Sequence, residues 1–156
     1  MSDLLFVYGT LLSSSPHPMA RQLSREAQLL GPAKCQGTLY DFGKWPGMLL
    51  AGSGSVYGDV YYLHDVPFSL RNLDAYEGIG ENVENPEYER RVIPVQFASG
   101  RTVAAWAYTY LWPVTTGTII QSGRWHCAPN RLLRSHYLGQ GTPVVDSSPR
   151  ATSPIS

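Results

Sequence analysis

The sequence lacks features that are typical of several classes of protein. Its two cysteines, Cys35 and Cys127, are too few for a disulfide framework, and neither stands in a CxxC or metal-ligand spacing. No run of about 18 apolar residues occurs, so no membrane span is expected. The 12 basic and 12 acidic residues cancel, so no overall field favours nucleic acid or an anionic membrane. No secretory signal is visible, and we expect a cytoplasmic protein.

What the chain does contain is enough apolar material for one packed domain. Of its 156 residues 43% are hydrophobic and 15% are charged, which is the balance of a globular chain. From about residue 140 onward, Gly, Pro, Ser and Thr dominate and large apolar side chains become rare. We therefore predict a domain over residues 1–139 and a flexible tail over residues 140–156.

Apolar patterning predicts an α+β fold. A helix is expected over residues 19–30, ended by Gly31, and a weaker one over residues 126–137. Strands are expected over residues 4–8, 34–42, 56–63, 90–97 and 102–110, the last two as a hairpin. Residues 78–89, which carry several glutamates, are expected to form a solvated loop. Because strands and helices do not alternate strictly, the order favours a mixed sheet or a partly closed barrel.

The most informative residue lies at the end of another short helix, expected over residues 66–78. Asp65 can cap this helix, and Gly78 can end it. Its apolar stripe follows helical spacing through Val66, Leu70 and Leu73. The next position on that stripe is Glu77, so the helix aims a carboxyl group inward. Burial penalises the charged form and should raise the pKa of Glu77 toward neutrality, which suits general acid–base catalysis. A structural Glu paired with an arginine or a backbone amide fits the same pattern.

Several short motifs follow one another along the chain. They are FVYGTL (6–11), WPGM (45–48), LDAYEG (73–78), PEYER (86–90), WAYTY (106–110) and SGRW (122–125). Their order resembles that of the γ-glutamylcyclotransferase-like proteins, also called the AIG2-like or γ-glutamylamine cyclotransferase family. The resemblance implies a small α+β fold, a mixed-sheet β-barrel with two or three packed helices.

The resemblance also implies a reaction. In that family the α-amine of a γ-glutamyl group attacks its own γ-carbonyl, which releases an amine and forms 5-oxoproline. A positioned group must take a proton from the attacking amine and return it to the leaving one, and the resemblance assigns this role to Glu77. The nucleophile belongs to the substrate, so no cofactor and no metal are expected. The expected partner is a small-molecule γ-glutamyl substrate; the oligomeric state is left open.

Substrate binding is expected at the turn formed by Tyr8, Gly9, Thr10 and Leu11. Gly9 lets the backbone approach a ligand, and successive amides there can hold an anion, which the resemblance identifies as the substrate carboxylate. An ordinary strand-to-loop turn fits the same residues. Two further candidates are Tyr88 as a donor at the rim and Arg90 as a partner of Glu77 or another acid, for which a packed tyrosine and a surface arginine are the alternatives. The others are Trp45, as a lid aromatic and not a catalytic group, and Tyr110 in the pocket wall.

Two departures from the family pattern are expected to change which substrate is bound more than which reaction is catalysed. The loop after the first strand, residues 12–18, lacks the basic residue and the Asn that are common there, and Arg124 stands where the family often has an acid. Two other functions fit parts of the sequence. One is a catalytically silent binding or interaction module on the same fold. The other is a thiol enzyme that pairs Cys127 with a histidine, which activity surviving thiol alkylation would dismiss.

Overall fold

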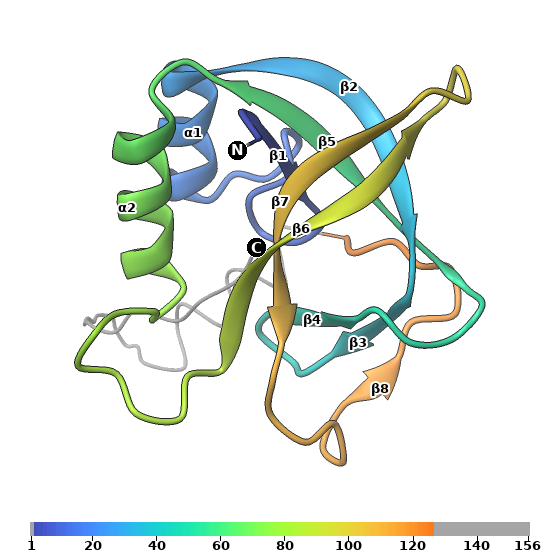
Figure 1. The fold of residues 1–156 in the computed structure, drawn as a ribbon. Helices are drawn as coiled ribbons and strands as arrows, with labels where there is room; N and C mark the ends of the chain where they lie inside the picture. Colours follow the sequence, from blue (N-terminus) through green and yellow to red (C-terminus); the bar gives the residue numbers. More distant parts are fainter. Residues whose placement is uncertain (1, 127–156) are drawn as a thin grey trace.

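Five strands close into a barrel in the computed structural model, which describes residues 2–126 (Figure 1). In barrel order the strands are β1 (Leu4–Val7), β5 (Ser55–Leu63), β2 (Ala27–Gln36), β6 (Tyr88–Phe97) and β7 (Thr102–Tyr110). A smaller sheet at one end of the barrel contains β4 (Pro46–Leu49), β3 (Thr38–Asp41) and β8 (Thr118–Ile119). The helices α1 (Pro18–Glu26) and α2 (Val66–Tyr76) lie together on one side. The predicted α+β barrel is confirmed.

The strand β1 makes the sheet mixed. It runs antiparallel to β5, with Leu4 opposite Tyr62, and parallel to β7, with Leu5 opposite Trp106. Its residues Leu5, Phe6 and Val7 are all fully buried, which explains why this strand is a continuous apolar run and shows no alternation.

Two apolar clusters fill the molecule, and β1 contributes to both. Phe6 belongs to a cluster with Val60 and Ile93 of the barrel strands. Its neighbours Leu5 and Val7 belong to a second cluster, which also contains Leu23 of α1 and Leu70 and Leu73 of α2. Side chains alternate across a strand, so β1 joins the two clusters. The stripe predicted for α2 therefore packs inward, which determines where the end of that helix lies.

The helix α2 begins and ends as its sequence predicts. The Oδ1 atom of Asp65 accepts a hydrogen bond from the amide of Phe68 at 3.2 Å, and a proline occupies the first turn. The helix ends at Tyr76, after which Glu77 takes the cap position and Gly78 has a φ of +77°. A left-handed φ is a conformation that glycine adopts without strain, which explains why the helix stops here.

The first predicted helix is too long at its C-terminal end. The helix α1 ends at Glu26, and residues 27–30 already form the start of β2, with Gln28 opposite Tyr62 and Leu29 opposite Tyr61. Pairing with β5 satisfies the backbone groups that the last helical turn would have satisfied. Leu29 and Leu30 remain 45% and 43% exposed, so their apolar spacing does not reflect burial. Gly31 lies at an irregularity in the pairing and is not a helix stop.

The other predicted element boundaries differ less from the observed ones. The strand expected over residues 34–42 is divided between β2 and β3, with Gly37 between them, and β4 begins at Pro46. The hairpin of β6 and β7 begins at Tyr88, earlier than expected. Apart from His126, the helix expected over residues 126–137 lies outside the described residues, as do Cys127 and the tail over residues 140–156. In the described part of the chain, neither helix is long and apolar enough to cross a membrane.

Candidate active site

Glu77 lies at the C-terminal end of α2 with its side chain fully buried. Its backbone amide donates to the carbonyl of Leu73 at 2.8 Å, so the helix determines its direction. Its charge raises the pKa of two tyrosines, Tyr88 of β6 and Tyr108 of β7, although burial is the larger cause for both. The inward carboxyl group is therefore near the end of the barrel where β6 begins and β7 ends.

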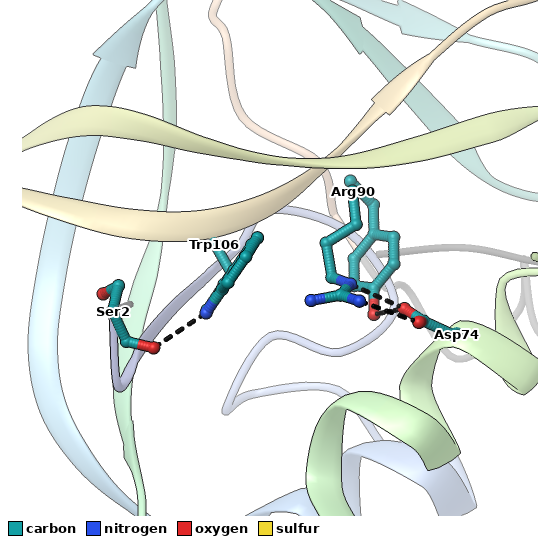
Figure 2. Close-up of polar contacts among 5 residues, drawn as sticks. Ser2, Asp74, Arg90 and Trp106 are labelled. Carbon is teal, nitrogen blue, oxygen red and sulfur yellow. Dashed lines mark hydrogen bonds and ion pairs between the residues drawn. The ribbon is translucent and has the colours of Figure 1, made fainter. Parts of the chain in front are cut away.

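Asp74, one turn before Glu77, attaches the helix to the barrel. Its carboxylate accepts from Arg90 in a bidentate pair, with Nε at 2.9 Å and Nη2 at 3.1 Å, and from the Tyr108 hydroxyl at 2.7 Å. The Arg90 guanidinium also lies 4.5 Å from the ring centre of Trp106 (Figure 2). The acid that pairs with Arg90 is thus Asp74, and Arg90 positions α2 relative to the strands.

The turn from Tyr8 to Leu11 is buried and joined to the same helix end. The Tyr8 hydroxyl donates to the carbonyl of Tyr108 at 2.7 Å, and the amide of Leu12 donates to the carbonyl of Gly9 at 3.0 Å. The Thr10 side-chain oxygen lies 3.2 Å from the hydroxyl of Tyr76, which directly precedes Glu77. Tyr76 therefore contacts the turn expected to bind the substrate carboxylate, and the next residue is Glu77, the expected acid–base group.

His17, which the sequence analysis did not assign to the site, continues this chain of hydrogen bonds. Its Nδ1 atom accepts from the amide of Met19 at 3.1 Å and so caps α1. The proton of a neutral ring is then on Nε2, which lies 3.3 Å from the Tyr76 hydroxyl. Tyr76 in turn reaches Thr10. A histidine followed by Pro18 at the start of a helix is the sequence signal that could have identified this cap.

Protonation of His17 would remove the lone pair that caps α1, and burial lowers the pKa of His17. The unfolded chain therefore takes up the proton more readily than the folded one, so this contribution to stability is present above about pH 6.5 and is lost as the pH falls. We expect the free energy of unfolding to decrease between about pH 7.5 and about pH 5.5, and to decrease less in His17→Asn, whose Oδ1 can accept from Met19 without titrating. Urea unfolding of both proteins at the two pH values measures this. An equal decrease in both would contradict it.

Tyr88 is packed more deeply than a rim position. Its side chain is fully buried, and its hydroxyl donates to the carbonyl of Pro46 at 2.6 Å. Its pKa is raised well above the usual value, first by burial and then by the charges of neighbours that include Glu77 and Glu87. Tyr88 is therefore near both carboxyl groups and remains protonated.

Glu87 contacts two candidate site residues, but the sequence placed it in the loop expected to be solvated. Glu81 and Glu84 of that loop are exposed, but Glu87 is half-buried. The indole Nε1 of Trp45 donates to its Oε2 at 3.2 Å, and the Tyr110 hydroxyl also donates to its carboxylate. Burial raises the pKa of Glu87, while these two hydrogen bonds oppose the shift. Trp45 and Tyr110 are thus both joined to one acid.

The departures from the family pattern are Arg124 and the loop over residues 12–18, which includes His17. The guanidinium of Arg124 lies 3.9 Å from the ring centre of Tyr57, and both residues line a cavity of about 480 Å³. The rest of that cavity is formed by β2, by Gly58 of β5 and by the tip of the β6–β7 hairpin, and none of these residues is a buried acid or base. In the loop over residues 12–18, the amide and hydroxyl of Ser13 donate to Asp59 at 2.9 Å and 2.8 Å.

The cysteine and metal chemistry of the described residues is limited. Cys35 is buried, and burial raises the pKa of its thiol to about 12, so it remains protonated at neutral pH. Cys127 lies outside the described residues. Within residues 2–126, no group of three His, Cys, Asp or Glu side chains is arranged to hold a metal ion.

Comparison with known proteins gives a consistent result. The sequence model of the family described as "Gamma-glutamyl cyclotransferase, AIG2-like" matches residues 5–127. The chain is 35% identical to the γ-glutamylcyclotransferase family protein YtfP of Escherichia coli K12 over 124 residues, 78% of this chain and 94% of that one. The solution structure of that E. coli protein superposes with a TM-score of 0.54, at 34% identity, over 78% of this chain and 95% of that one.

Two crystal structures have a similar fold. YkqA from Bacillus subtilis has a TM-score of 0.59 at 25% identity, over 80% of this chain and 40% of that longer chain. An AIG2-like protein from mouse has a TM-score of 0.54 at 25% identity, over 69% of this chain and 76% of that one.

Proposed function

Because the chain belongs to the AIG2-like γ-glutamyl cyclotransferase family, we propose that it converts a γ-glutamyl amide into 5-oxoproline and a free amine. The observation that carries the proposal is the fully buried Glu77 at the end of α2, beside the turn of residues 8–11. A carboxyl group excluded from water and directed by a helix is suited to proton transfer.

The reaction moves two protons from the attacking nitrogen to the departing one. The α-ammonium of the substrate gives its first proton to the Glu77 carboxylate, and the resulting amine attacks the γ-carbonyl carbon. A C–N bond forms within the substrate, and Glu77 gives the proton to the departing nitrogen as the original amide C–N bond breaks. The ring nitrogen then gives a second proton to the Glu77 carboxylate, which passes it to the free amine, so the products are the neutral lactam and an ammonium ion and Glu77 is a carboxylate again. Water is not consumed, and ring closure supplies the proximity that a second substrate would otherwise need.

The turn of residues 8–11 would bind the substrate α-carboxylate through its backbone amides. Gly9, Thr10 and Leu11 are buried, and the Thr10 hydroxyl is held by Tyr76. An anion there would lie close to the helix end that carries Glu77, because Tyr76 and Glu77 are adjacent. Asp74 and Arg90 would position the helix and have no direct contact with the reacting atoms.

The test is 5-oxoproline release by the purified protein from a panel of γ-glutamyl compounds. The panel contains γ-glutamyl-alanine, γ-glutamyl-ε-lysine and a γ-glutamyl aminoacyl conjugate. We expect at least one member to give 5-oxoproline and free amine in equal amounts. Release of glutamate in place of 5-oxoproline would indicate hydrolysis and contradict the proposal, as would the absence of turnover with every γ-glutamyl amide tried.

A further inference from the structure

The cavity of about 480 Å³ that contains Arg124 lies near the tip of the β6–β7 hairpin, away from the candidate active site. Tyr88 is opposite Tyr110 at one end of the hairpin, and Gln96 is opposite Thr102 at the other. The distance from Tyr88 to Gln96 along β6 is roughly 25 Å. The cavity is therefore a separate site, and its volume is typical of sites that bind small molecules.

Two cations line this cavity, Lys34 of β2 and Arg124, and none of its other lining residues is an acid. Lys34 also borders a neighbouring cavity of about 350 Å³, whose wall likewise contains no acid. In the described part of the chain, neither cation forms an ion pair. Asp59, which is opposite Pro32 of the cavity wall, accepts from the amide and the hydroxyl of Ser13. Both positive charges can therefore act on a bound anion.

Arg124 is held in one orientation by its neighbours. Its guanidinium lies 3.9 Å from the ring centre of Tyr57, and its amide donates to the Ser122 hydroxyl at 3.2 Å. The carbonyl of Gly123 accepts from the Tyr57 amide at 2.9 Å, and Gly123 has a φ of +71°, which favours glycine. A guanidinium stacked on a ring keeps its N–H groups at its edge, where they can bind a carboxylate or phosphate in a bidentate pair.

Lys34 lies beside this arginine on the outer face of the barrel. It is opposite Tyr57 in β5 and opposite Gln96 in β6. Residues directly opposite one another in neighbouring strands share a face of the sheet, so the three side chains form a row with Arg124 over its Tyr57 end. The amide nitrogen of Gln96 donates to the carbonyl of Gly100 at 3.2 Å, which attaches the row to the hairpin turn.

We propose that this cavity binds a small organic anion with two negative charges, through Arg124 and Lys34. Pro32 and Phe97 also line the cavity and would contact the apolar body of such a ligand. Phosphate monoesters and dicarboxylates share this chemistry. An acid in place of Arg124, which is common in the family pattern, would remove one of the two cations. The inference does not depend on the proposed function, because the site is separate from Glu77.

Titrations followed in ¹H–¹⁵N spectra test the site. The probes are phenyl phosphate and phthalate, both dianions at about pH 7.5, with benzyl alcohol as the neutral counterpart at matched ionic strength. We expect saturable shifts of the Gly58 and Gly100 amide signals with the two dianions and none with benzyl alcohol. The tighter of the two dianions identifies the charged group that the cavity prefers. Inorganic phosphate should bind about tenfold more weakly than phenyl phosphate, because it lacks an apolar body.

Charge-neutral variants test the two cations. In Arg124→Gln and in Lys34→Gln, the dissociation constant for phenyl phosphate should rise about tenfold, because each change removes a charge-assisted hydrogen bond. Both residues are exposed, so the fold should be kept, which circular dichroism verifies. The control is Arg101→Gln, the same charge change on an exposed residue of the hairpin turn that does not line the cavity. It should bind phenyl phosphate as the wild type does.

Three results would overturn the site. The first is the absence of a saturable shift with both dianions, or an equal affinity for benzyl alcohol. The second is an equal loss of affinity in Arg101→Gln and Arg124→Gln, because a long-range charge effect would then explain the binding. The third is a set of shifts at the Gly9 and Glu77 amides in place of Gly58 and Gly100, which would assign the anion to the candidate active site. None of these results depends on 5-oxoproline release.

Discussion

Glu77→Gln is expected to lower kcat for 5-oxoproline release by about 10²- to 10⁴-fold, the usual contribution of a positioned acid–base group. Glutamine has nearly the same shape but cannot take the proton from the substrate ammonium. The effect should fall on kcat more than on KM, because the residues proposed to bind the α-carboxylate lie in the separate turn of residues 8–11. Steady-state kinetics on the best substrate of the panel measure both constants.

Glu81→Gln is the matched control, since Glu81 is an exposed glutamate of the loop that follows α2. It should keep wild-type kinetics. Circular dichroism and thermal melts of both variants separate a loss of chemistry from a loss of fold. Turnover by a folded Glu77→Gln protein within about threefold of wild type would reject Glu77 as the acid–base group.

Gly58→Ala is expected to destabilise the protein by about 3 kcal/mol or more, toward the upper end of the cost of overpacking a core. A Cβ atom at Gly58 of β5 would overlap the backbone carbonyl of Val7 in β1. Backbone cannot move aside as a flexible side chain can, and Val7 leads into the turn at Tyr8. The substitution should therefore weaken barrel closure and displace that turn. Chemical denaturation, followed by tryptophan fluorescence, measures the change.

Gly80→Ala serves as the comparison, because the nearest atom to an added Cβ there is a methyl carbon of Val83 at 3.7 Å, an ordinary contact. Its free energy of unfolding should stay within about 0.5 kcal/mol of wild type. If Gly58→Ala were as stable as Gly80→Ala, the close approach of β1 to β5 would not be what requires a glycine at position 58.

Local chemistry made the helix α2 predictable. Asp65, Gly78 and the apolar stripe of α2 all act within a few residues of one another, and they place Glu77 inward without knowledge of the remaining chain. The end of α1 was not predictable in this way. Residues 27–30 have helical apolar spacing, but backbone pairing with β5, more than thirty residues later, places them in a strand.

Glu87 and His17, which the sequence did not assign to the candidate site, also depend on partners that are distant in the sequence. Glu87 is withdrawn from its acidic loop by Trp45 and Tyr110, which belong to separate segments. His17 acquires its second contact only when α2 brings Tyr76 close. The pairing of Arg90 with Asp74 was left open for the same reason. Side-chain contacts across the fold become visible only when the barrel order is known.

The parallel pairing of β1 with β7 has a consequence for how the chain folds. Leu5 is opposite Trp106, so the barrel cannot close until segments far apart in the sequence have met. Contacts of such long range slow folding, because the entropy of a large loop is lost before its contacts form. Until β7 arrives, one edge of a strand made of Leu, Phe and Val remains unpaired, and such edges promote association between chains. The residues that lead into the candidate substrate turn are thus among those most exposed to aggregation while the chain is still folding.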